Sequence, residues 1–184
     1  VRALSEVDLD VYGGEVVAIV GDNGAGKSTL VKILSGVHPQ DSGTIKFEGT
    51  AVSIPTPTAA RDLGIETVYQ DLSLCDNLDV VSNLWLGREL RTGGRLDEVE
   101  MEQRSWMLLR ELSARIPSVR VPVAALSGGQ RQTVAIARSL IGNPRVVILD
   151  EPTAALGVAQ TAEVLNLIER LRERGLGVIL ISHN

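Results

Sequence analysis

The chain of 184 residues has little of what marks several classes of protein. Cys75 is its only cysteine, so a disulfide within the chain and a zinc site built on cysteines are excluded, and a reducing compartment is expected. Aromatic residues make up 3% of the sequence, which predicts an aliphatic core and argues against a base-stacking surface for single strands. The formal net charge of −5 argues against a protein that binds nucleic acid by neutralising phosphates.

Long hydrophobic runs are also missing. The longest aliphatic stretches, at 16–20, 146–149 and 178–181, have the length of strands and fall far short of the ~20 apolar residues of a transmembrane helix. An apolar share of 44% and a charged share of 22% are ordinary for a globular domain. The chain begins at Val1 without a methionine and stops at Asn184 directly after an apolar strand, so we expect a piece cut from a longer protein.

Strand-like and helix-like segments alternate along the chain. Strands are predicted at 15–20, 44–47, 66–69, 146–150 and 177–182, and helices at 26–35, 59–63 and 158–173. The stretch from about 72 to 140 is more polar and mostly helical, with breaks at Gly93-Gly94, Pro117 and Pro122. This alternation predicts an α/β fold with a mostly parallel sheet, whose ligand lies at the carboxyl ends of the strands.

The strongest chemical motif follows the first predicted strand. Residues 21–28 read Gly-Asp-Asn-Gly-Ala-Gly-Lys-Ser and fit the phosphate-loop pattern G-x-x-x-x-G-K-[ST] between a strand and a helix. Glycines let the backbone wrap a phosphate, and N–H groups at the start of the helix donate to its oxygens. Lys27 would reach the β- and γ-phosphates, and the Ser28 hydroxyl would bind Mg²⁺. The predicted nucleotide-binding residues here are Gly21, Asn23, Gly24, Ala25, Gly26, Lys27, Ser28 and Thr29.

Two adjacent carboxylates stand at the end of the apolar strand 146–150. Asp150 would hold Mg²⁺, and Glu151 would orient or deprotonate an attacking water. A kinase acting on a small substrate does not need the second carboxylate, whereas attack by water does. The pair therefore favours hydrolysis of the nucleotide.

A second anion site is predicted at residues 126–130, Leu-Ser-Gly-Gly-Gln. Ser127 is a natural N-cap, and two glycines follow it before a helical run, which places a hydroxyl and bare N–H groups at the positive end of a helix. With the phosphate loop and the carboxylate strand in this order, the chain resembles the ATP-binding cassette (ABC) ATPases. Residues 126–130 look like the signature motif of that family, in which Ser127, Gly128, Gly129 and Gln130 would complete the ATP site of a neighbouring cassette.

The resemblance covers nearly the whole chain and implies a single, truncated nucleotide-binding domain. A P-loop NTPase core with a small N-terminal antiparallel β part would comprise residues 1–71 and 141–184, and an inserted helical lobe about 72–140. Gln70 is similar to the glutamine of the family that contacts Mg²⁺ and the lytic water. His183 looks like the histidine that touches the γ-phosphate.

The resemblance also implies partners and a location. ATP would be sandwiched in a dimer of two such domains, which would bind permease subunits at the cytoplasmic face of the inner membrane. Residues 82–89 look like the corresponding stretch in cassettes of bacterial carbohydrate importers, which implies a sugar as cargo, a periplasmic solute-binding protein as an indirect partner and no nucleic acid. Two alternatives stay open: a soluble ABC ATPase acting on nucleic acid or ribosomes, and a nucleotide-binding fragment without its own turnover.

Two positions depart from the family pattern. Gly157 follows Leu156 where the family usually has an aspartate that crosses the dimer, which puts that contact in doubt more than the ATPase activity. The aromatic residue that stacks on adenine usually lies upstream of the first strand. Tyr12 is too close to Lys27 for that role, and we expect it to be a packing residue instead.

Overall fold

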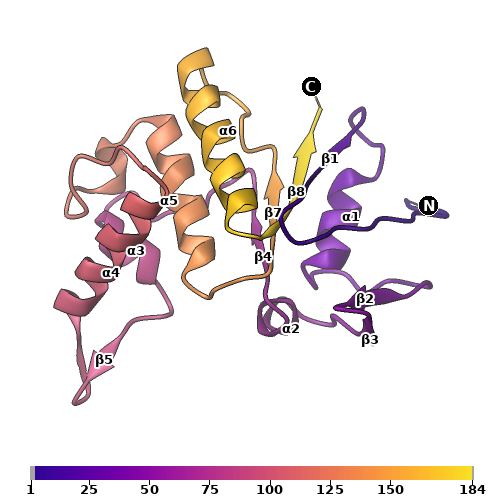
Figure 1. Cartoon of the computed structure of the whole chain (residues 1–184), viewed down its shortest axis with the longest axis horizontal. Coiled ribbons are helices and arrows are strands. Elements are labelled where there is room, and N and C mark those ends of the chain that lie inside the picture. The colour runs from indigo at the N-terminus through magenta and orange to yellow at the C-terminus, as the bar shows by residue number, and fades with distance from the viewer. Residues whose placement is uncertain (1–2, 184) are drawn as a thin grey trace. The chain divides into compact units, whose positions relative to one another are not determined.

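The computed structural model describes residues 3–183, which form two compact units (Figure 1). The first unit contains the chain up to Gln70, residues 142–152 and the chain from Leu171 onward. The second unit contains residues 71–141 and 153–170. Within the described residues, no helix has both the length and the apolar character that a membrane span requires.

A four-stranded parallel sheet is the centre of the first unit (Figure 1). Its strands are β1 (Val16–Val20), β4 (Ile65–Val68), β7 (Val146–Asp150) and β8 (Gly177–Ser182), in the order β1-β8-β7-β4. They are short and rich in valine and isoleucine, and β7 is fully buried from Val147 to Leu149, as is usual in the middle of a parallel sheet. The predicted α/β fold with a mostly parallel sheet is confirmed.

Two helices and a hairpin complete the first unit. They are α1 (Lys27–Leu34), α2 (Pro57–Asp62) and the antiparallel pair β2 (Ile45–Phe47) and β3 (Thr50–Val52). The core contains Val31 of α1 together with Ile148 and Ile179 of the sheet. Helix α2 begins earlier than predicted because Thr56 accepts a hydrogen bond from the N–H of Ala59, and the proline that follows Thr56 is preorganised for a first helical turn.

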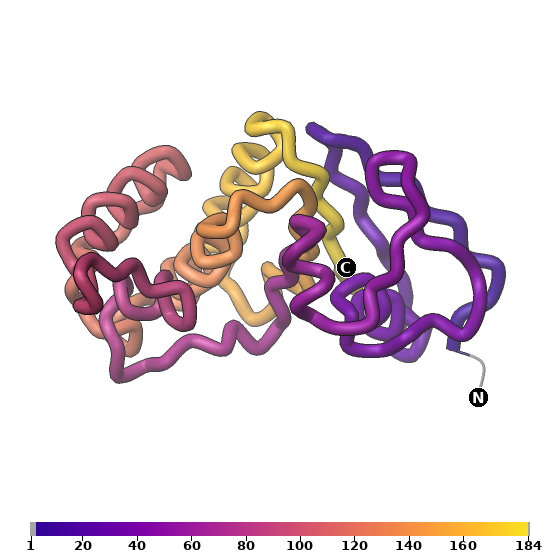
Figure 2. Tube along the Cα trace, turned by 90° about the horizontal axis from the view of Figure 1, so that it is seen from below, coloured from indigo at the N-terminus to yellow at the C-terminus, as the bar shows by residue number. Residues whose placement is uncertain are grey.

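The second unit is helical. It contains α3 (Val80–Trp85), α4 (Glu98–Glu111), a short 3-10 turn (Val123–Ala125), α5 (Gly128–Leu140) and most of α6 (Val158–Glu173). Helix α3 packs against both α4 and α5, which Figures 1 and 2 show from two sides. The predicted break at Gly93-Gly94 is the turn of a small hairpin, β5 (Arg91–Thr92) and β6 (Arg95–Leu96), in which both glycines have positive φ.

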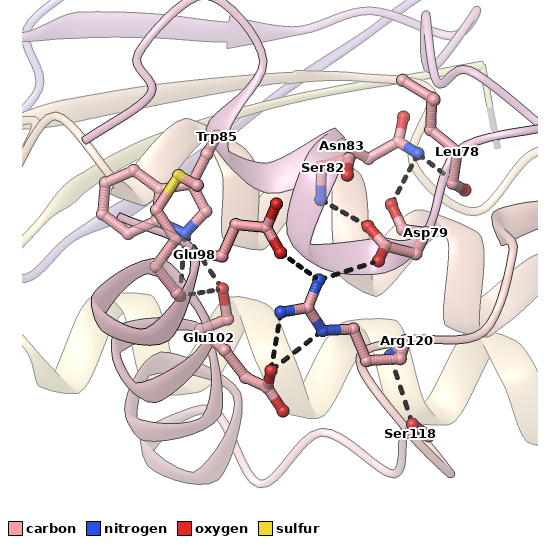
Figure 3. A network of polar contacts seen from close by, with 11 residues as sticks. Leu78, Asp79, Ser82, Asn83, Trp85, Glu98, Glu102, Ser118 and Arg120 are labelled. Carbon is pink, nitrogen blue, oxygen red and sulfur yellow. Dashed lines mark hydrogen bonds and ion pairs between the residues drawn. The ribbon is translucent and has the colours of Figure 1, made fainter. Parts of the chain in front are cut away.

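One arginine joins several parts of this helical unit (Figure 3). The guanidinium of Arg120 lies 2.8 Å from Glu102, 3.4 Å from Asp79 and 3.7 Å from Glu98. Asp79 also caps α3 by accepting a hydrogen bond of 2.7 Å from the N–H of Ser82. Burial raises the pKa of Asp79, but the hydrogen bonds from Ser82 and Arg120 outweigh it, so this pKa lies below its usual value. Because the cluster is partly exposed, it orients the starts of α3 and α4 more than it stabilises the fold.

Candidate active site

The register of the parallel sheet brings the predicted catalytic residues to one edge. The last paired residues are Val20 with Ser182, Ile181 with Asp150, and Leu149 with Val68. Gly21, His183 and Glu151 each come directly after one of these strands, and Gln70 comes two residues after β4. Because the carboxyl ends of parallel strands meet at the same edge, the loops that carry these four residues begin side by side.

The phosphate loop is a tight turn that only glycine tolerates at its end. Gly24 and Gly26 have φ values of +88° and +94°, in the left-handed region. A Cβ atom on Gly26 would lie 2.7 Å from the carbonyl oxygen of Ala3. Gly26 is also the N-cap of α1 and offers no side chain to the helix, so no side-chain cap competes with an anion for the first-turn N–H groups. The loop therefore fits a phosphate group.

Lys27 places its charge over this loop. Its Nζ atom donates to the carbonyl oxygens of Gly21 and Asp22, the latter at 2.9 Å. The pKa of Asp150 at the end of β7 is raised, by burial first and then by Glu151, and the attraction of the Lys27 charge opposes this rise. Ser28 is exposed and Thr29 is half-buried in the first turn of α1. The Lys27 ammonium group is thus held against the backbone of the phosphate loop, where the sequence predicts that it binds phosphate.

The two carboxylates at the end of β7 disfavour each other's charge. Burial first, and then the neighbouring charge of Glu151, raise the pKa of Asp150, and the attraction of Lys27 offsets this only in part. A divalent cation would relieve that repulsion. The carboxylate of Asp150, the hydroxyl of Ser28 and the amide oxygen of Gln70 are oxygen donors of the kind Mg²⁺ prefers, so these residues fit a magnesium site.

We expect Asp150→Asn to stabilise the chain in the absence of nucleotide. The raised pKa means that the folded state binds a proton at Asp150 more tightly than the unfolded state, so this group's contribution to stability falls as pH rises. The variant should therefore melt at a higher temperature than wild type at pH 7, and this gain should vanish as pH falls to the usual carboxyl value of 3.8. Thermal melts across pH measure it.

The exposed Asp62→Asn in α2 is the matched control and should not change the melting temperature. With Mg-ATP added, the sign should reverse, because Asp150→Asn removes a metal ligand and loses the stabilisation that ligand binding gives. A lower melting temperature for Asp150→Asn without nucleotide would contradict the electrostatic account.

Glu151 and His183 form a pair. The Nδ1 atom of His183 lies within hydrogen-bond distance of the Oε2 atom of Glu151. The side chain of Glu151 is 14% exposed, whereas that of His183 is 48% exposed. Glu151 has a φ of +52°, uncommon for a residue other than glycine, and its N–H donates to the carbonyl oxygen of Ile181 at 3.1 Å. Such strain is typical of functional positions, and the pairing itself was not part of the sequence prediction.

Gln70 is exposed, while both of its flanks are held. The hydroxyl of Tyr69 donates to the Oγ atom of Ser35 at 2.9 Å. On the other side, Arg138 donates to the carbonyl oxygen of Leu72 at 2.8 Å. One flank of Gln70 is thus held through the Tyr69 side chain and the other through the Leu72 backbone, and Gln70 itself is exposed.

The signature segment belongs to the second unit and begins α5 with a capping box. The Oγ atom of Ser127 accepts from the N–H of Gln130 at 3.3 Å, and the Oε1 atom of Gln130 accepts from the N–H of Ser127 at 3.0 Å. The Nε2 atom of Gln130 donates to the carbonyl oxygen of Arg115. The predicted N-cap is confirmed, and the amide of Gln130 has a structural use that the sequence did not reveal.

The glycines of the signature segment also serve packing. A Cβ atom on Gly129 would lie 3.1 Å from the Cβ of Gln160, and one on Gly128 would lie 3.2 Å from the Leu156 side chain. Helix α5 can approach the start of α6 this closely only without side chains at these two positions. The Ser127 hydroxyl and the N–H groups of the two glycines are the groups left to meet an anion.

Two further sequence expectations can be compared with the structure. Tyr12 was expected to be a packing residue, and this is wrong: its side chain is 69% exposed, because it stands at the turn where its N–H donates to Glu15. Gly157 stands at the start of α6, where its carbonyl oxygen accepts from Thr161 and its N–H donates to Gln160. No side chain is present at this position to extend from the helix start.

The match to a known family decides the identification. The family model described as ABC transporter matches residues 4–154. The chain belongs to the ABC transporter family. It is 48% identical over its whole length to a xylose/arabinose import ATP-binding protein of Sulfolobus acidocaldarius, and spans 73% of that protein. A fructose import ATP-binding protein of Rhizobium meliloti is 47% identical over the whole chain, which spans 74% of it.

Solved ABC cassettes share the fold. One is an ATP-binding cassette of an ABC transporter in its ADP conformation, with a TM-score of 0.86 and 27% identity over 99% of this chain and 75% of that one. Another is a dimeric cassette in a post-hydrolysis state bound to ADP and Pi, with a TM-score of 0.79 and 27% identity over 99% of this chain and 80% of that one. The predicted resemblance to ABC ATPases is confirmed.

Proposed function

We propose that this chain is the ATP-binding and ATP-hydrolysing subunit of an ABC importer whose cargo is a sugar. The observation that carries the ATPase assignment is the shared sheet edge, where the phosphate loop, Asp150, Glu151 and His183 begin adjacent loops. The names of the relatives, which are sugar import proteins, support the cargo class and disfavour a role on nucleic acid or ribosomes.

Each residue has a role in the proposed reaction. The loop from Gly21 to Gly26, the first-turn N–H groups and the Lys27 ammonium bind the β- and γ-phosphates. Ser28, Asp150 and Gln70 would hold Mg²⁺, which supplies charge neutralisation on the phosphates when bound. Glu151 accepts the proton of the attacking water, and His183 orients that carboxylate and contacts the γ-phosphate.

The signature residues give a reason for a dimer. Ser127, Gly128 and Gly129 lie in a different unit from the phosphate loop, and in the proposal they contact the γ-phosphate of ATP bound to a second cassette. The dimeric cassette among the solved relatives supports this arrangement. Residues 1–71 and 141–184 would form the ATP-binding core of one nucleotide-binding domain, and about 72–140 its helical lobe.

The remaining partners follow from import. Permease subunits would bind this chain at the cytoplasmic face of the inner membrane, and a periplasmic solute-binding protein would deliver the cargo to them. The cassette is expected to make no contact with the cargo. The sugar is therefore selected by the partners.

Reconstitution tests the proposal. In vesicles that hold the permease subunits, with this chain outside and the solute-binding protein inside, we expect ATP hydrolysis to rise when xylose, ribose or fructose is enclosed. The same vesicles with the Glu151→Gln chain are the control and should show no rise. Hydrolysis that responds to ribosomes or RNA and to none of the sugars would support the soluble alternative. A complete lack of turnover would support a nucleotide-binding chain without activity.

A further inference from the structure

An arginine of α5 holds the backbone two residues after Gln70. The Nη2 atom of Arg138 donates to the carbonyl oxygen of Leu72 at 2.8 Å, and its Nη1 atom donates to that of Ser73 at 2.8 Å. The planar guanidinium presents two donors side by side, so both carbonyl groups are fixed in direction as well as position. A charged donor also makes each bond stronger than one between neutral groups.

The chain between these carbonyls and Gln70 has little freedom. Ser73 has a φ of +50°, and its N–H donates to the Oδ1 atom of Asp71 at 3.1 Å. The segment therefore bends locally between Asp71 and Ser73. A serine in the left-handed region is costly, and the two bonds from Arg138 oppose its relaxation.

A second side chain fixes the far end of the same segment. Asn83 of α3 is fully buried, and its Oδ1 atom accepts from the N–H of Cys75 at 2.7 Å. Its Nδ2 atom donates to the carbonyl oxygens of Cys75, Leu78 and Asp79 at 3.0–3.2 Å. Residues 75–79 are thus tied to α3, and residues 72–73 to α5. Of the two side chains, Arg138 binds the part of the segment that is nearer to Gln70 in the sequence.

We propose that Arg138 is a positioning residue for Gln70: it fixes the carbonyl groups of Leu72 and Ser73 and so limits the freedom of the Gln70 backbone two residues earlier in the chain. The inference rests on the proposed function, in which Gln70 contacts Mg²⁺ and the lytic water. Helix α5 then carries the signature residues at its start and, in its last turn, the arginine that holds the Gln70 segment.

A double-mutant cycle on ATP hydrolysis by the full chain tests this role. Arg138→Gln should lower kcat by roughly 10–100-fold, the usual effect of removing a residue that orients a ligand from outside the site, with KM for ATP nearly unchanged. In a Gln70→Ala background, the same substitution should change kcat by less than about twofold, because the group that Arg138 positions is already gone. Equal losses in both backgrounds would overturn the proposal.

Cys75 gives a readout that does not depend on activity. It is the only cysteine, is half-buried and lies two residues after Ser73, where the contacts with Asn83 begin, so its rate of alkylation rises if loss of the Arg138 contacts lets this segment open. Without nucleotide, Arg138→Gln should raise the rate by roughly tenfold or more, since two charge-assisted bonds are lost. The matched control is Arg104→Gln on α4, whose exposed ion pair with Glu100 lies within one helix. It should leave both the alkylation rate and kcat unchanged.

Separate controls test whether the variants fold and whether the proposed function holds. If Arg138→Gln fails to fold by thermal melt, Arg138→Lys replaces it in the same cycle, because lysine keeps the charge but cannot present two coplanar donors. Additive losses for Arg138→Lys, or wild-type alkylation of Cys75, would again overturn the role of Arg138. Loss of ATP hydrolysis in the wild-type chain would instead contradict the proposed function and leave the alkylation result to decide the structural tie.

Discussion

Glu151→Gln should reduce ATP turnover by ~10²–10⁴-fold while ATP binding is retained. Glutamine keeps the size of the side chain and a hydrogen-bonding oxygen but removes the proton acceptor. The Glu151 carboxylate is mostly buried and paired with His183, so few other groups can replace it as the proton acceptor. Steady-state hydrolysis and calorimetric ATP affinity on the same protein separate the two effects.

The same variant should trap the dimer. With hydrolysis blocked, ATP stays between two cassettes, so light scattering should show a dimer that requires ATP and Mg²⁺. Asp150→Asn is the contrasting variant, because it removes a proposed metal ligand, and it should bind Mg-ATP weakly and remain monomeric. A Glu151→Gln protein that hydrolysed ATP at the wild-type rate would move the general-base role to another residue, with His183 the next candidate.

Much of the fold could be predicted because short local patterns of apolar and polar residues determine its strands and helices. The strands 146–150 and 177–182 and the helix 158–173 have the predicted bounds, since each is an apolar run or stripe with clear ends. The phosphate loop could be found because its glycines, lysine and serine have fixed spacing. The hairpin at 91–96 was missed, because strands of two residues leave no alternating pattern to read.

The pairings between distant residues could not be predicted in the same way. The contact between Glu151 and His183 depends on the register of β7 against β8, and this register cannot be read from the sequence. Arg138 and the carbonyl of Leu72 are separated by 66 positions, and an arginine in a helix gives no local sign that it binds backbone. Tyr12 was misjudged for a local reason: it begins a turn that runs through Gly13 and Gly14 to Glu15, and it is exposed there.

Lys27→Ala and Ser127→Arg should each abolish most ATP hydrolysis alone, yet recover activity when mixed. Lys27→Ala removes the charged donor from a site otherwise built from neutral N–H groups, so tight binding of the β- and γ-phosphates should be lost. Ser127→Arg places a long side chain at the exposed start of α5, where the proposal puts the phosphate of a neighbouring chain's ATP. It also removes the N-cap, so thermal melts must first show that the variant folds.

The recovery follows from two-fold symmetry. In a dimer with one chain of each variant, one site combines the intact phosphate loop of the Ser127→Arg chain with the intact signature segment of the Lys27→Ala chain. The other site carries both lesions. Equal mixing makes about half of the dimers mixed, so about a quarter of all sites should be intact, and hydrolysis should rise toward that fraction of the wild-type rate. A matched mixture of Lys27→Ala with Lys27→Ala/Ser127→Arg chains contains no intact loop and should stay inactive. If the first mixture also stayed inactive, or if Ser127→Arg alone hydrolysed ATP at the wild-type rate, the signature segment would not serve a second chain's ATP.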